Sequence, residues 1–201
     1  MSAAQNGTCL PRLAVLVSGN GSNLQAVLDA CAEGRLPARV AVVISNRREA
    51  YALERARLAG VPVVVKPKPK DQDRRIYDAE MAGIVQAYAP DWVILAGWMR
   101  VLSSAFLDAF PRRVINLHPA LPGTFPGTHS IERALEAYRR GEIQETGVMV
   151  HYVPDEGVDC GPVIAQARVE IQPEDTLQAL EARVHAAEHR LLVEAIERVL
   201  Q

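Results

Sequence analysis

The sequence predicts an α/β domain, a mostly parallel, twisted sheet with helices on both faces. This class is indicated by the alternation of two kinds of segment and by the unbroken apolar character of one kind. Short runs rich in valine, isoleucine and leucine alternate with stretches of helical spacing through the first half of the chain, and continuous apolar runs are typical of parallel strands buried on both faces. The 201 residues suffice for one such domain with a substantial core.

Strands and helices alternate through the first half of the chain. Leu24, Val27 and Leu28 lie on one face of a helix, and Gly60 and Pro90 end the next two helices. This order predicts a Rossmann-like half. Its expected strands cover residues 12–18, 39–45, 61–65 and 91–96, with a fifth starting at 114, and its expected helices cover 22–34, 48–58 and 71–88.

The second half departs from this alternation. Asp175 and Thr176 are expected to cap its last helix. We expect a single domain over residues 1–201, with a phosphate- or nucleotide-binding half at about 12–115 and a second half at about 116–201. The expected elements of the second half are a proline- and glycine-rich loop over 119–127, a helix over 130–140, strands over 146–153 and 162–171, and a helix over 176–200.

Composition and charge exclude several classes of protein. A formal net charge of −2 gives no bulk electrostatic case for binding nucleic acid or an anionic membrane. The three cysteines, Cys9, Cys31 and Cys160, lack CxxC spacing, which favours reduced thiols over a disulfide framework or a zinc site. Residues 1–11 do not have the pattern of a signal peptide, and no apolar run reaches the length of a membrane span. We expect a cytoplasmic protein.

Asn116-Leu117-His118-Pro119 closes a short apolar run and is the most informative stretch of the chain. Ligands bind beyond the carboxyl ends of strands in open α/β sheets, and residues two apart on a strand point the same way. The amide of Asn116 would then lie beside the imidazole of His118, a pairing that suits the oxyanion formed at an attacked carbonyl. The alternative is that Asn116 caps a turn and His118 is a structural histidine.

A glycine-rich loop, Ser18-Gly-Asn-Gly-Ser-Asn-Leu24, joins the first strand to the first helix. Free backbone N–H groups at a helix N-terminus bind phosphate, and Ser22 and Asn23 would add side-chain donors beside Gly21. Leu24 stands in place of the third glycine of a GxGxxG fingerprint, and no Gly-Lys-Ser/Thr of a P-loop follows. We expect a monophosphate site; a plain turn capped by Ser22 is the alternative.

Acidic residues and histidines supply the remaining candidates. Asp159 comes just before the Gly-Pro that opens an apolar strand, where a carboxylate can orient a histidine and stabilise its protonated form. Asp155 and Glu156 have the character of a charged hairpin tip. His185 and His189 are four residues apart on the last helix, a possible ligand spacing, but no HExxH motif is present, and we predict no metal site.

Four motifs stand in order along the chain: Ser18–Gln25, Ala96–Leu102, Asn116–Pro119 and Asp155–Asp159. Together they resemble the phosphoribosylglycinamide formyltransferase family, folate-dependent enzymes of purine synthesis, over nearly the whole chain. The resemblance implies a formyltransferase fold, and transfer of a formyl group from 10-formyltetrahydrofolate, as co-substrate, to the amine of glycinamide ribonucleotide. It implies no metal, and we expect a monomer or a homodimer.

The same resemblance implies roles for individual residues and makes 116–201 the catalytic and folate-binding half. One departure follows the histidine: the family usually reads Pro-Ser-Leu-Leu-Pro there, and this chain reads Pro-Ala-Leu-Pro-Gly. The resemblance therefore does not fix the shape of this loop, and the catalytic residues are unaffected. The matching residues are Asn116, His118 and Asp159 for catalysis, Gly21, Ser22 and Asn23 for the substrate phosphate, Glu188 for the ribose hydroxyls, Met99, Arg100, Val101 and Leu102 for the folate pocket, and Arg74 for the folate's glutamate tail.

Three other functions compete with this one. A formyltetrahydrofolate hydrolase of the same superfamily would use water in place of the amine and need no phosphate loop, and its usual N-terminal regulatory domain is not expected because the first strand starts near Arg12. An enzyme that formylates initiator methionyl-tRNA would need a further RNA-binding domain. A catalytically silent nucleotide- or folate-binding module would not need an intact Asn116, His118 and Asp159.

Overall fold

The computed structural model describes residues 10–201. Cys9 and most of the stretch considered as a signal peptide lie outside the described residues. Cys31 and Cys160 carry free thiols. No helix within residues 10–201 is both long and apolar enough to cross a membrane.

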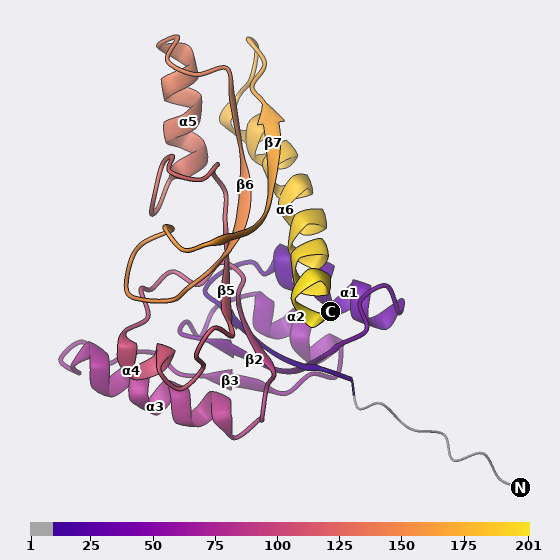
Figure 1. Ribbon diagram of the computed structural model, residues 1–201, viewed down its shortest axis with the longest axis vertical. Helices are drawn as coiled ribbons and strands as arrows, with labels where there is room; N and C mark the ends of the chain where they lie inside the picture. Colours follow the sequence, from indigo (N-terminus) through magenta and orange to yellow (C-terminus); the bar gives the residue numbers. More distant parts are fainter. Residues whose placement is uncertain (1–9) are drawn as a thin grey trace, which may run out of the picture.

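A seven-stranded sheet has the order β3-β2-β1-β4-β5-β6-β7 (Figure 1). The strands β1 to β5 pair in parallel, whereas β6 is antiparallel to β5 and β7 is antiparallel to β6. The predicted α/β class with a mostly parallel sheet is confirmed. The strands are β1 Arg12–Val17, β2 Arg39–Ser45, β3 Val63–Val65, β4 Trp92–Leu95, β5 Val114–His118, β6 Glu145–Tyr152 and β7 Val163–Glu170.

Helices cover both faces of the sheet, so that β1 is buried on both sides (Figure 1). Leu13, Val15 and Val17 pack in the layer of α1, α2, α5 and α6. Ala14 and Leu16 point the other way, into the layer of α3 and α4. This is why β1 reads as a continuous apolar run. The helices are α1 Ser22–Ala32, α2 Ala52–Leu58, α3 Arg74–Gln86, α4 Ser104–Leu107, α5 Ser130–Arg139 and α6 Leu177–Leu200.

The helix boundaries differ from the predicted ones for local reasons. Helix α3 starts at Arg74 rather than at residue 71, because the side chain of Asp73 accepts hydrogen bonds from the backbone N–H groups of Arg75 and Ile76 and caps the helix. The cap predicted at Thr176 is confirmed. The sequence does not predict α4, since four residues are too few to show a helical period.

The strand order reverses between β1 and β4. β2 and β3 lie on one side of β1, and β4 and β5 lie on the other, which opens a crevice beyond the carboxyl ends of the central strands. There the backbone N–H of Ser18 donates to the carbonyl of Gly97 at 3.0 Å. The glycine-rich loop after β1 and the segment after β4 therefore meet at one edge of the sheet, beside the end of β5.

Candidate functional site

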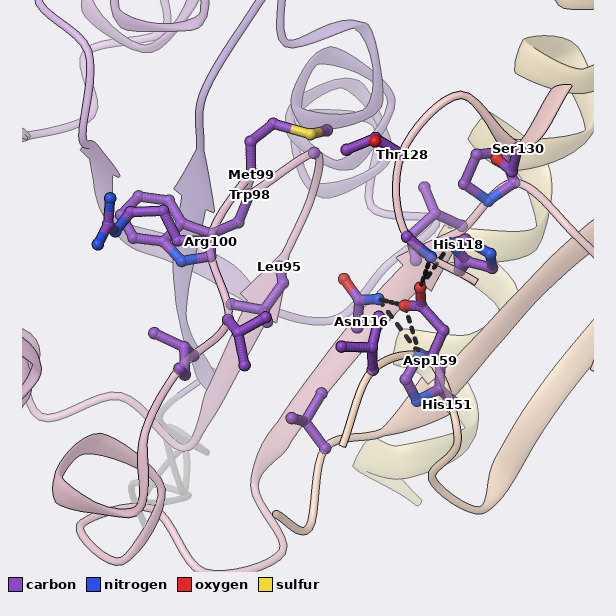
Figure 2. Close-up of a pocket in the computed structure, with 18 of the residues that line it drawn as sticks. Leu95, Trp98, Met99, Arg100, Asn116, His118, Thr128, Ser130, His151 and Asp159 are labelled. Carbon is purple, nitrogen blue, oxygen red and sulfur yellow. Dashed lines mark hydrogen bonds and ion pairs between the residues drawn. The ribbon is translucent and has the colours of Figure 1, made fainter. Parts of the chain in front are cut away.

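A cavity of about 700 Å³ lies beyond the carboxyl ends of β4 and β5, within the size range of small-molecule sites. Residues 97–102, which follow β4, form one wall, and the loop between β6 and β7 forms the other (Figure 2). Asn116 and His118 of β5 line the cavity between these walls. Arg47, His151 and residues 127–130 also contribute to the lining.

Asp159 connects the three residues predicted to be catalytic. One carboxylate oxygen, Oδ1, accepts a hydrogen bond from Nδ2 of Asn116 at 3.0 Å. The other, Oδ2, lies 3.2 Å from Nδ1 of His118 and accepts the backbone N–H of Gly127 at 2.8 Å. The loop that carries Asp159 thus folds back onto the end of β5. The structure brings Asn116, His118 and Asp159 together, as Figure 2 shows.

His151 is a member of this cluster that sequence reasoning missed. It lies directly opposite Asn116 in the β5–β6 pair, and its Nε2 is 3.2 Å from Nδ2 of Asn116. Its Nδ1 is 2.8 Å from the carbonyl oxygen of Tyr152, so a neutral ring that donates there accepts from Asn116 at Nε2. The amide hydrogens of Asn116 therefore point at Asp159 and His151, and its oxygen lies on the cavity side (Figure 2).

Burial and charge act in opposite directions on His118. Burial lowers the pKa of this imidazole below its ordinary value, while the carboxylate of Asp159 and the carbonyl of Phe125, 3.1 Å from Nε2, act to raise it. Burial also acts to raise the pKa of Asp159, but the neighbouring His151 and His118 rings and the N–H of Gly127 outweigh it and lower that pKa. Asp159 is therefore a carboxylate beside a histidine whose charged form is disfavoured by burial.

The segment predicted to form the folate pocket lines the cavity. Met99, Arg100, Val101 and Leu102 all contribute to the lining. The side chains of Met99 and Val101 are exposed, and Leu102 is buried. The guanidinium of Arg100 lies over the ring of Tyr77, 5.2 Å from its centroid.

Arg74 is placed differently from the folate-pocket residues. It forms an ion pair with Glu156 of the loop between β6 and β7 and is not among the cavity-lining residues. Glu156 also accepts the backbone N–H of Ser104 at 2.9 Å. Glu156 is therefore not the free hairpin tip that its sequence context suggests, because it ties the loop to the start of α4.

The predicted phosphate site lies in the loop after β1, which contacts the segment after β4 through Ser18. Gly21 precedes α1 with a φ of 78°, and a Cβ there would lie 2.5 Å from the Cβ of Ala52 at the start of α2. Asn23 donates to Oε2 of Glu188 at 3.2 Å, so the structure brings these two candidates together from α1 and α6. The alternative that Ser22 caps α1 is wrong, since Gly21 holds that position and no side chain caps the helix.

Glu188 is 4% exposed, although it carries a carboxylate. Its Oε2 lies 2.7 Å from Nδ1 of His185, which raises the pKa of that histidine. Neither Glu188 nor the loop residues 21–23 line the cavity beyond β4 and β5. Among residues 10–201, no three histidine, cysteine, aspartate or glutamate side chains are grouped as a metal site.

Comparisons with known proteins identify the family of the chain. Residues 11–196 match the model of the family described as formyl transferase. The chain is 46% identical over 200 residues to a phosphoribosylglycinamide formyltransferase of Schizosaccharomyces pombe, covering 94% of this chain and 96% of the relative. It is 43% identical over 198 residues to that of Dictyostelium discoideum, covering 92% and 96%. The crystal structure of glycinamide ribonucleotide transformylase 1 from Symbiobacterium toebii superposes with a TM-score of 0.88 at 47% identity, covering 94% of this chain and 86% of that one.

Proposed function

The chain belongs to the formyl transferase family, and we infer that it catalyses the reaction of its phosphoribosylglycinamide formyltransferase relatives. In that reaction a formyl group moves from 10-formyltetrahydrofolate to the amine of glycinamide ribonucleotide, a step of purine biosynthesis. The observation that carries the inference for this chain is the meeting of Asn116, His118 and Asp159 at one cavity.

The cavity has the chemistry that a folate needs. Trp98, Met99 and Val101 face it from one wall and Val158 from the other, and apolar walls with few polar groups suit a flat ring system. The co-substrate supplies the formyl carbon, and these residues hold its ring beside β5. For the glutamate tail, Arg100 is the better placed arginine, because it lines the cavity while Arg74 is paired with Glu156.

We assign the ribonucleotide to the patch between α1 and α6. Gly21, Ser22 and Asn23 present backbone N–H groups at the start of α1, where phosphate is favoured by the helix dipole. Glu188 accepts hydrogen bonds from the ribose hydroxyls, and its contacts with Asn23 and His185 hold it for that role. The amine of the ribonucleotide then extends toward the end of β5.

The chemistry at the formyl carbon requires donors for the oxygen that gains negative charge as the amine attacks. In its protonated form, which the carboxylate of Asp159 favours, His118 places a positive charge beside that oxygen, and it donates to the oxygen once one of its N–H groups leaves Asp159 or the Phe125 carbonyl. Asn116 donates once its amide turns from Asp159 and His151 toward the cavity. Asp159 then assists in removing the proton that the attacking amine releases. That proton passes to N10 of the folate as the bond between N10 and the formyl carbon breaks. The side-by-side binding of both substrates supplies the orientation.

An assay of the purified chain with glycinamide ribonucleotide and 10-formyltetrahydrofolate tests this function. We expect formyl transfer to the amine and much slower formate release in a control without the ribonucleotide. Formate release at the same rate with and without the amine would favour the hydrolase. Binding of both ligands with no product would favour the catalytically silent module.

We propose that the enzyme works in the cytoplasm, where the free thiols of Cys31 and Cys160 stay reduced. We propose a monomer or a homodimer, which sedimentation of the purified protein distinguishes.

A further inference from the structure

Arg133 of α5 binds a loop segment that both reactive side chains touch. Its Nη2 donates to the carbonyl oxygen of Phe125 at 2.8 Å and to that of Pro126 at 2.6 Å. Its guanidinium lies over the ring of Phe125, 5.8 Å from the centroid. One side chain thus makes three contacts with two successive residues, each of the kind that arginine makes better than lysine.

The segment 125–127 reaches the reactive cluster from its other side. The carbonyl of Phe125 lies 3.1 Å from Nε2 of His118, and the N–H of Gly127 donates to Asp159 at 2.8 Å. His118 therefore has an acceptor at each ring nitrogen, Asp159 at one and Phe125 at the other. A small movement of this segment would disturb both groups at once.

The backbone of the segment is not in a relaxed conformation. Phe125 has a φ of 44°, in the left-handed region that non-glycine residues rarely adopt. Such a conformation persists only where surrounding contacts impose it, since it costs on the order of 1–3 kcal/mol. Arg133 bonds the carbonyl of Phe125 and covers its ring, and His118 and the hydrophobic core supply further contacts to the same residue.

We propose that Arg133 is a positioning residue, which holds segment 125–127 so that Phe125 and Gly127 orient His118 and Asp159 for formyl transfer. The proposal rests on the function proposed for these two side chains. It gives a role to the loop that departs from the usual family sequence after the histidine. Arg133 itself does not line the cavity, so it acts through the segment and not on the substrates.

The groups around His118 determine in which direction its pKa should change when Arg133 is replaced, and this direction tests the proposal. Burial is the largest influence and lowers the pKa of His118; Asp159 and the Phe125 carbonyl raise it, and His151 and Arg133 lower it. The Phe125 carbonyl raises the pKa of His118 by more than Arg133 lowers it. If Arg133 holds that carbonyl in place, its loss lowers the pKa of His118 further. If Arg133 is only a nearby charge, its loss raises the pKa.

The experiment uses the full chain with Arg133→Met, which keeps the length of the side chain and removes its charge and donors. NMR titration of the ring protons of His118 in the free protein is expected to show a lower midpoint than in the wild type. Amide hydrogen exchange at Gly127 is expected to speed up. Turnover is expected to fall by roughly 10- to 100-fold, because the reactive groups are misplaced, while the KM for glycinamide ribonucleotide stays near its original value.

Arg140→Met is the matched control, since Arg140 ends the same helix but is exposed and bonded to Glu142. It should change none of these quantities.

Arg133→Lys keeps the charge without the planar group, and turnover should fall by several-fold. This variant tests the proposal if Arg133→Met does not fold. An unchanged or raised midpoint for His118, or turnover within twofold of wild type in the folded variants, overturns the proposal. The titration needs no substrate, so it stands even if the wild type fails to formylate glycinamide ribonucleotide.

Discussion

The reactive cluster at the end of β5 and the cavity wall formed by the segment after β4 are held in opposite ways. At the end of β5 the side chains hold one another, because Asp159 contacts both Asn116 and His118, and Asn116 also contacts His151. His118 and His151 are almost completely buried. None of these side chains can turn without breaking a contact with another.

In segment 97–103 the backbone is fixed instead. The N–H of Met99 donates to Oγ of Ser18 at 2.9 Å, and the N–H of Ser103 donates to the buried carboxylate of Asp78 at 2.7 Å. Between these two points the side chain of Met99 remains exposed. Reacting groups need a set orientation, whereas recognition of a flat ligand needs a rigid frame with adaptable side chains.

The largest expected effect is at the fixed side chains. His118→Ala should reduce turnover by roughly 100- to 1,000-fold, as expected for loss of a donor to a developing oxyanion, with the circular dichroism spectrum unchanged. Asn116→Ala and Asp159→Asn should also be strongly impaired. The triple variant should be little worse than the worst single variant, because residues that act as a unit are not additive. Near-normal turnover in folded His118→Ala or Asp159→Asn contradicts the mechanism.

Asp159→Asn also has a predicted pH signature. The carboxylate raises the pKa of His118, so its loss lowers that pKa and leaves less of the protonated form at any given pH. The limb of the profile of turnover against pH that reports His118 should therefore move to lower pH. A limb that stays in place would show that Asp159 does not control the charge of His118.

The next effect is expected in the phosphate loop. Because Gly21 has a φ of 78° and a Cβ would meet Ala52, Gly21→Leu should displace the start of α1 and weaken ribonucleotide binding by roughly 10- to 100-fold, with folate binding retained. Gly34→Leu is the control, since Gly34 has a φ of 73° but open space around it. Calorimetric titration of both variants with each ligand measures this. Unchanged ribonucleotide affinity in folded Gly21→Leu removes the assignment.

A smaller effect is expected in segment 97–103, whose backbone is held by a hydrogen bond to Ser18. Ser18→Ala leaves the N–H of Met99 without its acceptor, which should cost about 1–3 kcal/mol of stability and raise the KM for the formyl donor more than it lowers kcat. Ser103→Ala is the control, because its buried hydroxyl has no hydrogen-bond partner. Equal effects of the two variants on that KM would show that Ser18 does not hold this wall.

The smallest effect is expected at the arginines. Arg74→Ala removes a partly exposed ion pair with Glu156, and such pairs contribute about 0–1 kcal/mol. Arg100→Ala should reduce the preference for folates that bear the glutamate tail by a few-fold. Binding of folates with and without the tail to both variants is the measurement. If neither loses the preference, the tail binds elsewhere.

The way each part of the site is held also explains which of its residues the sequence could predict. The strands and most helices follow from apolar periodicity, and the placement of Asn116 and His118 follows from their spacing of two on a strand. His151 was out of reach because its place opposite Asn116 depends on the register of β5 with β6. Arg133 could not be predicted, because it contacts backbone carbonyl groups of a loop that contains a left-handed residue. No periodic pattern in the sequence indicates such a contact.

The strand β5, where the sheet changes from parallel to antiparallel pairing, limits where the chain can gain or lose a residue during evolution. Asn116 and His118 line the cavity, whereas Ile115 packs in the core, as does Leu117, although Leu117 also touches the cavity. One inserted residue within β5 would exchange these two sets, since side chains alternate with a period of two. The reactive groups would then enter the core and leucine would face the substrates. In a library of single-residue insertions and deletions, we expect residues 114–118 to tolerate none, and the turn at residues 140–144 to tolerate many.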